Sequence, residues 1–383
     1  MCQKKSLYFL LFVCLFVVAC TETVETPVSE PVEIVVVPTE EVTATLLPSP
    51  KTLSPNDNKD SEEDIVLLDY ALSPDGKTLA TYTNKRVEFY DIEMMESTIF
   101  MEFDDSGHLP YGGALAFSPD GKQLALSGKY FDDPVKLWDI EMHQQILSIS
   151  ELPENYYVSE VDFSPNGQSL LVRNLHHKAN HCEAGGEDKV TLHNLNENER
   201  IFEADKCVRY PPLQFQFTRN ELLFLYYGNM SGTYSIQVIN SNTGEEISYD
   251  KNAWEKYGGY LGVSPNGEIY LTRNLDLAND THETHLIEIS SGHVLDVFEG
   301  SIVHFQNSDT FIVNNYNISQ HTETSRWGYW EDNSIKCIYD GIKGSPEIKT
   351  SLNGERFALI WESELQIWDV STCEKIFTLV VRP

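Results

Sequence analysis

The side chains best suited to chemistry in this sequence are histidines and a cysteine that lie close together, with two further histidines downstream. They are His176, His177, His181 and Cys182, followed by His282 and His285. Imidazole and thiolate groups are the ligands that zinc and copper prefer. The spacing matches no established ligand pattern, however. We therefore expect a polar loop here, and we expect neither a metal nor a cofactor.

Other patterns for catalysis are weak. Asp276, Asn279 and Asp280 carry oxygen ligands, but they lack the alternation and the glycine of a calcium loop. There is no Gly-x-Ser-x-Gly elbow, no His-Glu-x-x-His pair and no phosphate-binding glycine-rich loop. Adjacent carboxylates are frequent in so acidic a chain and indicate nothing by themselves. The sequence favours a protein that is not an enzyme.

A repeated turn sequence indicates where the strands that would position any site begin and end. Ser-Pro-Asp-Gly stands at 73–76 and 118–121, and Ser-Pro-Asn-Gly at 164–167 and 264–267. Proline presets φ for the turn, the Asp or Asn accepts local backbone donors, and glycine fits the last position. Short runs rich in β-formers flank each turn and predict strands. Degraded copies of the turn occupy 218–221, 306–309 and 351–354.

The turns recur about every 45 residues, which is typical of a propeller blade with four strands. The third strand of each unit is expected to end on a pair such as Trp138-Asp139, Tyr339-Asp340 or Trp368-Asp369. Over residues 64–383 the chain therefore resembles the WD-repeat β-propellers. The resemblance implies an all-β fold, a seven-bladed β-propeller of four-stranded antiparallel blades. It also implies a structural hydrogen-bonded tetrad within the second blade, made by His108, Ser127, Asp132 and Trp138.

The expected ring closes between its last and first units. The stretch from Lys375 to Val381 is expected to be the fourth strand of the last blade. Closure would then rest on side-chain packing, because sheet edges left open invite aggregation. The residues expected to pack across this junction are Phe357, Ile360 and Trp361 on one side and Leu68, Tyr70 and Leu79 on the other.

The N-terminus has the organisation of an export signal. Lys4 and Lys5 precede an apolar run at 7–18 that is too short to span a bilayer. The run ends in Val-Val-Ala-Cys at 17–20, which resembles the bacterial lipobox. That resemblance implies a lipoprotein signal peptide, cleavage before Cys20, and acyl chains such as palmitate that anchor Cys20 in the membrane. The alternative is an ordinary signal peptide with an accidental cysteine.

Three segments follow from this organisation: a signal peptide at 1–19, a linker at 20–62 and the propeller at 63–383. The linker is rich in Thr, Pro, Glu and Val and has no aromatic residue. Such a segment cannot bury enough surface to fold, and its prolines make it a semi-rigid spacer. The apolar stretch 33–37 is the exception, since it could instead add a strand to a blade edge.

Charge and cysteines limit the partners and the compartment. The net charge of −32 repels phosphate backbones, so we expect no nucleic-acid partner, and it favours a soluble monomeric domain. Cysteines pair outside the cytoplasm. We prefer a bridge between Cys182 and Cys207, with Cys337 to Cys373 as a second pairing. Four cysteines allow three connectivities, and the sequence does not choose among them.

The connections between the second and third strands are longest in units 3 and 6, with a smaller excess in unit 5. Long loops on a rigid scaffold usually carry binding sites. Aromatic side chains are frequent there and in the links between blades, and they suit peptides, sugars or proteins. We expect Trp327 and Trp330 to be exposed, although packing between blades is the competing role. The candidate binding residues are Tyr210, Trp254, Tyr257, Trp327, Tyr329 and Trp330.

These observations predict a lipid-anchored propeller on the extracytoplasmic side of a bacterial cell membrane or envelope. It would serve as a binding module or scaffold for a protein, peptide or glycan, with the membrane as its second partner. The alternative function is a propeller enzyme, such as a hydrolase, a lyase or a quinone-dependent dehydrogenase, with its site in the central channel.

Overall fold

The computed structural model describes residues 65–381 apart from several connecting segments. The described ranges are 65–103, 112–130, 133–150, 156–176, 188–206, 214–228, 234–247, 259–276, 281–299, 301–305, 311–315, 326–331, 334–339, 342, 346, 348–361 and 363–381. All of them belong to the second of two compact units, residues 50–383. The signal peptide at 1–19, Cys20, the linker at 20–62 and the stretch 33–37 lie outside the described residues.

The described strands form seven four-stranded antiparallel sheets, numbered 1 to 7 here in chain order. Sheets 1 to 4 contain β1 (Leu67–Leu72), β2 (Thr78–Thr83), β3 (Arg86–Asp91), β4 (Glu96–Glu102); β5 (Leu115–Phe117), β6 (Gln123–Leu126), β7 (Val135–Asp139), β8 (Gln144–Ile149); β9 (Tyr156–Phe163), β10 (Ser169–His176), β11 (Asp188–Asn194), β12 (Glu199–Lys206); and β13 (Gln214–Thr218), β14 (Leu222–Gly228), β15 (Tyr234–Asn240), β16 (Glu246–Ile247). Sheets 5 to 7 contain β17 (Gly259–Val263), β18 (Ile269–Asp276), β19 (Thr281–Glu288), β20 (Val294–Glu299); β21 (Ser301–Phe305), β22 (Phe311–Asn315), β23 (Arg326–Glu331), β24 (Ser334–Tyr339); and β25 (Ile348–Thr350), β26 (Arg356–Trp361), β27 (Glu364–Asp369), β28 (Lys375–Val380).

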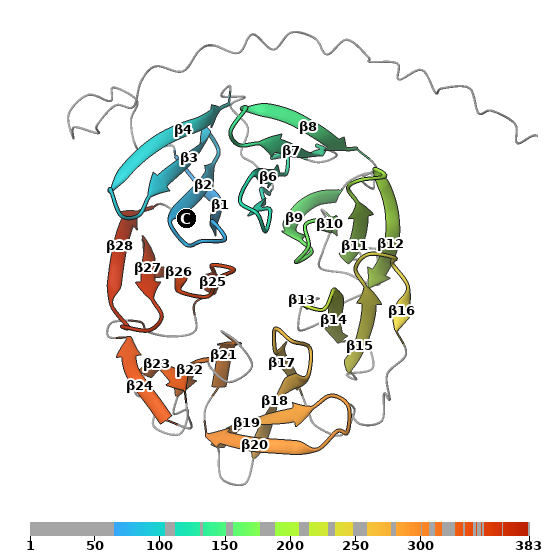
Figure 1. Ribbon diagram of the computed structural model, residues 1–383, viewed down its shortest axis with the longest axis vertical. Coiled ribbons are helices and arrows are strands. Elements are labelled where there is room, and N and C mark those ends of the chain that lie inside the picture. Colours follow the sequence, from blue (N-terminus) through green and yellow to red (C-terminus); the bar gives the residue numbers. More distant parts are fainter. Residues whose placement is uncertain are drawn as a thin grey trace, which may run out of the picture. The chain divides into compact units, whose positions relative to one another are not determined.

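The sheets are arranged around a common centre (Figure 1). Within each sheet the strands pair in chain order, so each strand neighbours the next one along the chain. The first strands, such as β1, β9 and β25, lie nearest the centre, and the fourth strands, such as β4, β12 and β28, lie at the rim. The chain is therefore an all-β propeller of four-stranded antiparallel blades, as the repeat predicts.

The first hydroxyl of the repeated turn makes the same bond to the Asp or Asn two residues on wherever the structure describes the turn. In sheet 1 the Ser73 hydroxyl donates to Asp75 Oδ1 at 2.6 Å and accepts the Thr78 N–H at 2.9 Å. Gly76 takes a φ of 72°, a left-handed conformation that favours glycine. Two of the degraded turns keep this arrangement, since Ser351 bonds Asn353 at 2.7 Å and the Thr218 hydroxyl bonds an asparagine in the same way. The third degraded turn, 306–309, lies outside the described residues.

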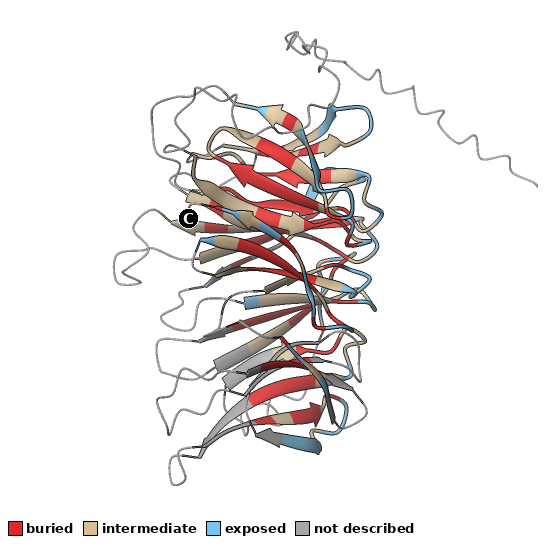
Figure 2. Cartoon of the chain, turned by 90° about the vertical axis from the view of Figure 1, so that its left-hand side faces the viewer, coloured by how far each residue is buried: buried red, intermediate tan, exposed pale blue. Residues whose placement is uncertain are grey.

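The hydrophobic core lies between neighbouring sheets, and Figure 2 shows buried residues within the strands and exposed ones at the turns of one end. Six clusters of buried apolar residues each span one junction: sheets 1–2, 2–3, 3–4, 4–5, 6–7 and 7–1. At the junction of sheets 5 and 6, β17 contacts β21. No single sheet covers both its faces, so each depends on its two neighbours.

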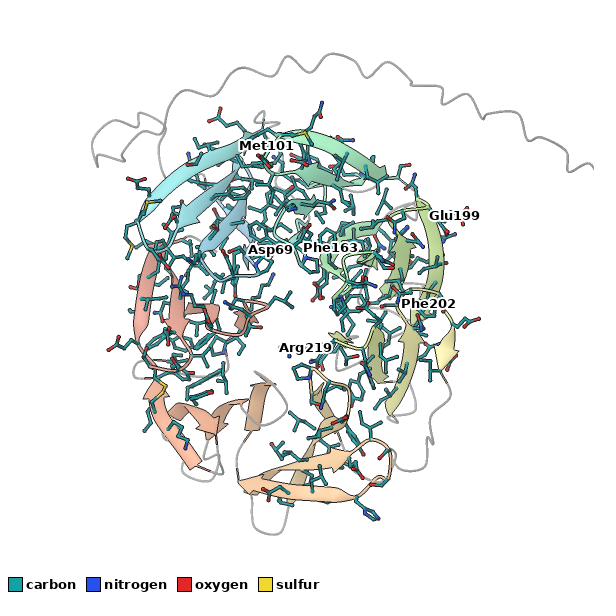
Figure 3. All side chains as sticks on the ribbon, viewed as in Figure 1. Asp69, Met101, Phe163, Glu199, Phe202 and Arg219 are labelled. Atoms are coloured by element: carbon teal, nitrogen blue, oxygen red, sulfur yellow. A yellow bond between two sulfur atoms is a disulfide. The ribbon has the colours of Figure 1, made fainter. Side chains whose placement is uncertain are left out.

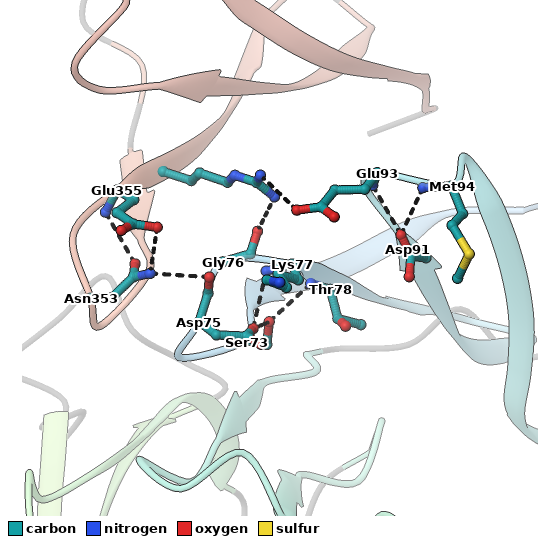
Figure 4. A network of polar contacts seen from close by, with 11 residues as sticks. Ser73, Asp75, Gly76, Lys77, Thr78, Asp91, Glu93, Met94, Asn353 and Glu355 are labelled. Carbon is teal, nitrogen blue, oxygen red and sulfur yellow. Dashed lines mark hydrogen bonds and ion pairs between the residues drawn. The ribbon is translucent and has the colours of Figure 1, made fainter.

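The junction of sheets 7 and 1 is held by packing and by polar contacts. Tyr70 and Leu79 of sheet 1 pack against Leu365 and Phe377 of sheet 7. Around the neighbouring turns the Arg356 guanidinium donates to the Gly76 carbonyl at 2.8 Å, and Asn353 Nδ2 donates to the Asp75 carbonyl at 3.1 Å (Figure 4).

The side chains that make this junction differ in part from those expected. Ile360 does pack there, at the edge of the cluster. Phe357 and Trp361 instead pack toward sheet 6, and Leu68 packs toward sheet 2, because neighbouring side chains on a strand point to opposite faces. The prediction for these three residues was wrong. The stretch that begins at Lys375 forms β28, the fourth strand of sheet 7, as expected.

The two described members of the expected tetrad, Ser127 and Trp138, are not hydrogen-bonded to each other. The Ser127 hydroxyl accepts the Ala114 N–H at 2.7 Å and donates to the Gly128 carbonyl at 3.2 Å, rather than meeting Trp138. Among the described residues, the buried Trp138 Nε1–H has no acceptor. The other two members, His108 and Asp132, lie outside the described residues.

A disulfide joins Cys337 of β24 to Cys373 in the turn before β28, and so links sheets 6 and 7. This is the second of the two pairings considered from the sequence. The preferred pair, Cys182 and Cys207, lies outside the described residues. Over the described part of the chain, no helix has the length and apolar character needed to cross a membrane.

Candidate functional site

The connections between second and third strands all leave the same end of the propeller, because the strands of every sheet alternate in direction. The longest separate β10 from β11 at 177–187 and β22 from β23 at 316–325, which are the two units expected from the sequence. Sheet 5 differs from the expectation, since its connection spans only 277–280. Its extra residues lengthen β18 and β19 instead of forming a loop.

Trp327, which we expected to be exposed on a loop, is fully buried at 0% exposure. It lies in β23 and packs with Tyr339, Phe357 and Trp368 at the junction of sheets 6 and 7. The error arose because Tyr339-Asp340 was taken as the end of the third strand of its unit, whereas Tyr339 ends the fourth strand, β24. The third strand therefore begins earlier, and Trp327 serves interblade packing.

The remaining aromatic candidates are distributed as follows. Tyr329 is partly buried against the same cluster as Trp327, so it too contributes to packing. Trp330 belongs to β23, but its side chain lies outside the described part. Tyr210, Trp254 and Tyr257 also lie outside the described residues. A ligand-binding role for these four residues stays a prediction.

The histidine-rich stretch is described only at its first member. His176 ends β10 and meets the Tyr156 ring edge-on, with centroids 4.9 Å apart. His177, His181 and Cys182 fall outside the described residues, and so does the side chain of His282. Within the described residues, no group of three or more His, Cys, Asp or Glu side chains is placed to hold a metal.

Polar side chains join the innermost strands around the propeller centre. Asp69 of β1 accepts the N–H of Leu115, in β5 of the next sheet, at 2.9 Å. The same carboxylate forms an ion pair with Lys349 of β25, so it links sheets 7, 1 and 2. Gln216 of β13 makes a comparable bridge, donating to the Val263 carbonyl at 2.6 Å and accepting the Val263 N–H at 2.8 Å. Figure 3 shows Asp69 near the centre of the ring.

Asp162 of β9 has the most strongly altered carboxyl group of these inner strands. Burial is the main cause that raises its pKa to about 7, and the neighbouring Glu160 carboxylate raises it further. The Phe163 N–H and the Lys349 ammonium act in the opposite direction. Glu160 in turn pairs with Arg173 at 3.3 Å. A carboxyl that titrates near neutrality is able to give or take a proton at physiological pH.

Sequence reasoning missed these inner-strand residues, although a signal for them exists. Asp162, Gln216 and Lys349 each stand two positions before the turn serine or threonine of their unit. Side chains two apart on a strand share a face. A polar residue two positions before the turn therefore indicates an innermost strand, next to the centre of the propeller.

The raised pKa gives a testable pH dependence. In the unfolded chain the Asp162 carboxyl titrates near 3.8, so between about pH 4 and pH 7 folding takes up a proton and stability falls as pH rises. Above pH 7 the folded protein keeps a poorly solvated charge on this half-buried side chain. Asp162→Asn removes that charge and is expected to stabilise the protein by about 2 kcal/mol at pH 8, and by almost nothing near pH 4. Urea unfolding at the two pH values measures the difference.

A matched control is Asp120→Asn, on the exposed turn of sheet 2. The Ser118 hydroxyl donates to the Asp120 carboxylate and lowers its pKa, so the loss of this charge brings no gain at pH 8. A gain for Asp162→Asn that is the same at both pH values would contradict the assignment of the charge penalty to this group.

Comparisons with known proteins agree with the fold. No protein-family model matches the chain, and no curated protein matches it in sequence. An oligogalacturonate lyase in complex with manganese superposes with a TM-score of 0.53 at 8% identity, over 77% of this chain and 87% of the lyase. The β-propeller domain of Cps50 (Swd1) from Myceliophteria thermophila has a TM-score of 0.46 at 12% identity, over 72% of this chain and 87% of that one. The superposition on the lyase supports a shared fold, and at 8% identity it says nothing about activity.

Proposed function

We propose that this protein is a lipid-anchored extracytoplasmic propeller that serves as a binding module or scaffold at the bacterial cell envelope. Its seven sheets are seven blades of one closed ring, and its partner is a protein, peptide or glycan. The end of the ring that carries the connections 177–187 and 316–325 is the proposed binding face. A signal peptide at 1–19 and a spacer at 20–62 would place this ring beyond the membrane surface.

The observation that carries the placement is the disulfide between Cys337 and Cys373. Structural disulfides persist in oxidising compartments and are rare in the cytoplasm. This pair is separated by 36 residues and joins two sheets rather than forming a local redox motif. The signal peptide predicted at 1–19 supports the same compartment independently.

A binding role agrees with the architecture. The buried clusters between neighbouring sheets hold the strands in place, whereas the long connections leave from one end of the ring. A rigid scaffold that presents variable loops on one face is a common arrangement for recognition. The net charge of −32 adds long-range repulsion of polyanions, so the proposed partner is neutral or basic.

A propeller enzyme is the second candidate, and one observation favours it. Asp162, whose pKa lies near 7, stands on an innermost strand with Glu160 beside it and Lys349 within electrostatic reach. Such a group is suited to general acid–base catalysis. Turnover of a glycan or ester substrate that is lost in Asp162→Asn, while the variant stays folded, would support the enzyme. Equal turnover by the variant and the wild type would exclude the Asp162 carboxyl as the catalytic acid or base.

The lipid anchor is tested by Cys20→Ser. In the native host, the wild-type protein is expected in the membrane fraction, because several acyl chains give stable anchoring. The variant is expected to leave that fraction, since the thiol that carries the lipid is gone. Quantitative immunoblots of the fractions measure the shift. Cys14→Ser, within the apolar run of the leader, is the control and should stay with the membranes. A Cys20→Ser protein that stays membrane-bound would refute the anchor.

A further inference from the structure

A small pocket lies between sheets 1 and 2, beside the connection between β6 and β7 and so at the same end of the ring as the connections 177–187 and 316–325. Its volume is about 170 Å³. For comparison, a dry cavity of about 150 Å³ accommodates a benzene ring. The walls are mostly apolar and come from both sheets, with Tyr82, Phe103, Leu126 and Trp138 among them. The pocket is therefore the right size and polarity for one substituted aromatic ring.

The charges at the pocket differ in sign from the rest of the chain. Two ammonium groups, Lys129 and Lys136, line it together with one carboxylate, Asp133. Among the described lining residues there are thus two positive charges and one negative, in a chain whose net charge is −32. Lys136 forms no ion pair with any described residue. A single negative charge on a ligand would balance the site.

Contacts within the protein hold the charged side chains of the pocket in position without a ligand. The Lys129 ammonium donates to the Asn84 carbonyl at 2.6 Å and lies 4.1 Å from the Phe103 ring centroid, so it is fixed against sheet 1. The Asp133 carboxylate accepts the Tyr130 N–H at 3.0 Å. Gly128 makes room for Asp133, because a Cβ there would lie only 1.9 Å from the Asp133 Cβ.

Hydrogen-bonding capacity also remains in the pocket wall. The Tyr82 hydroxyl donates to the Ser127 carbonyl at 2.9 Å, so it is already used. The buried Trp138 Nε1–H has no acceptor among the described residues, and a buried donor left unpaired is costly. An acceptor oxygen brought by a ligand, after a small shift of the surrounding side chains, would satisfy this donor.

We propose that the pocket between sheets 1 and 2 binds a small aromatic monocarboxylate. The ring fills the apolar part between Tyr82, Phe103 and Leu126. The carboxylate faces Lys136 and Lys129, and its single charge matches the local excess. The mostly apolar walls and the Asp133 carboxylate disfavour a phosphate dianion. This site lies at the same end of the ring as the proposed binding face but belongs to sheets 1 and 2 rather than to the long connections of sheets 3 and 6, and it does not depend on the lipid anchor.

The test uses the full-length protein in detergent and phenylacetate as the probe, followed by calorimetry. Phenylacetate is expected to bind, and its neutral isostere phenylacetamide to bind at least about tenfold more weakly, because the amide loses the charge pairing. Lys136→Met is expected to weaken phenylacetate binding about tenfold and to leave phenylacetamide binding unchanged. Lys122→Met, an exposed lysine in the turn of the same sheet, is the matched control and should bind phenylacetate as the wild type does.

Three results would overturn the proposal: no phenylacetate binding up to about 10 mM, equal binding of acid and amide, or equal loss in the two lysine variants. Melting curves of both variants show that the fold is kept. A second variant, Trp138→Phe, keeps the apolar wall and removes the donor. It is expected to weaken phenylacetate binding, and unchanged binding would exclude the indole as a contact.

Discussion

Replacement of Trp327 by alanine is expected to cost about 3–5 kcal/mol of the free energy of unfolding. The side chain is fully buried and packs against Tyr339, Phe357 and Trp368. Its removal leaves a large cavity between sheets 6 and 7, where the surrounding rings cannot fully collapse. Urea unfolding followed by far-ultraviolet circular dichroism measures the loss as a lower midpoint.

Two further variants serve as controls for this prediction. Trp327→Phe keeps most of the apolar volume and is expected to cost less than the alanine change. Met94→Ala, at a side chain that is 65% exposed in the turn after β3, is expected to leave the midpoint unchanged. If Trp327→Ala unfolds at the wild-type midpoint, the tryptophan is not in the core. If Trp327→Ala keeps full stability but loses partner binding, Trp327 belongs to the binding face instead.

The disulfide gives the second large effect. Cys337→Ser combined with Cys373→Ser is expected to lower the free energy of unfolding by about 3–4 kcal/mol, because the bridge restricts the unfolded chain over a separation of 36 residues. It also removes the covalent tie between sheets 6 and 7. Urea unfolding of the two proteins without reductant measures the difference.

Reductant supplies the control for this prediction. A thiol reductant should lower the midpoint of the wild type toward that of the double variant and have a smaller effect on the variant itself. A wild type that unfolds at the same urea concentration with and without reductant, and at the midpoint of the double variant, would show that the bridge contributes nothing.

The repeat could be predicted from the sequence because the turn chemistry is local. Ser73, Asp75 and Gly76 act within one turn, so their types alone indicate the geometry. The degraded copies were recognised by spacing, and Ser351 shows the same bonds as the full motif. Even Glu221 adopts the left-handed φ, at 62°, that glycine takes elsewhere in this turn.

Strand order within a unit could not be predicted where the end of the third strand was ambiguous. In unit 6 the fourth strand, which ends at Tyr339, was taken for the third, and this shifted Trp327 from the core to a loop. The local pattern did not resolve this, because both strands are rich in aromatic and β-branched residues. The pairing of Trp327 with Asn314 across the sheet decides the assignment.

The candidate sites depend on contacts between distant units, which a single sequence does not reveal. Asp69 and Lys349 are far apart along the chain and meet only because the ring closes. The pocket likewise needs Tyr82 from sheet 1 and Lys136 from sheet 2. Periodicity identified the faces of the strands but not which neighbours would meet.

The most direct test of the proposed function is a peptide map, by mass spectrometry, of the protein extracted from native membranes without reductant. The account predicts a first peptide that begins at Cys20 and carries a diacylglycerol, together with one linked peptide pair that contains Cys337 and Cys373. A peptide that includes residues before Cys20, or free thiols at 337 and 373, would contradict an anchored protein in an oxidising compartment.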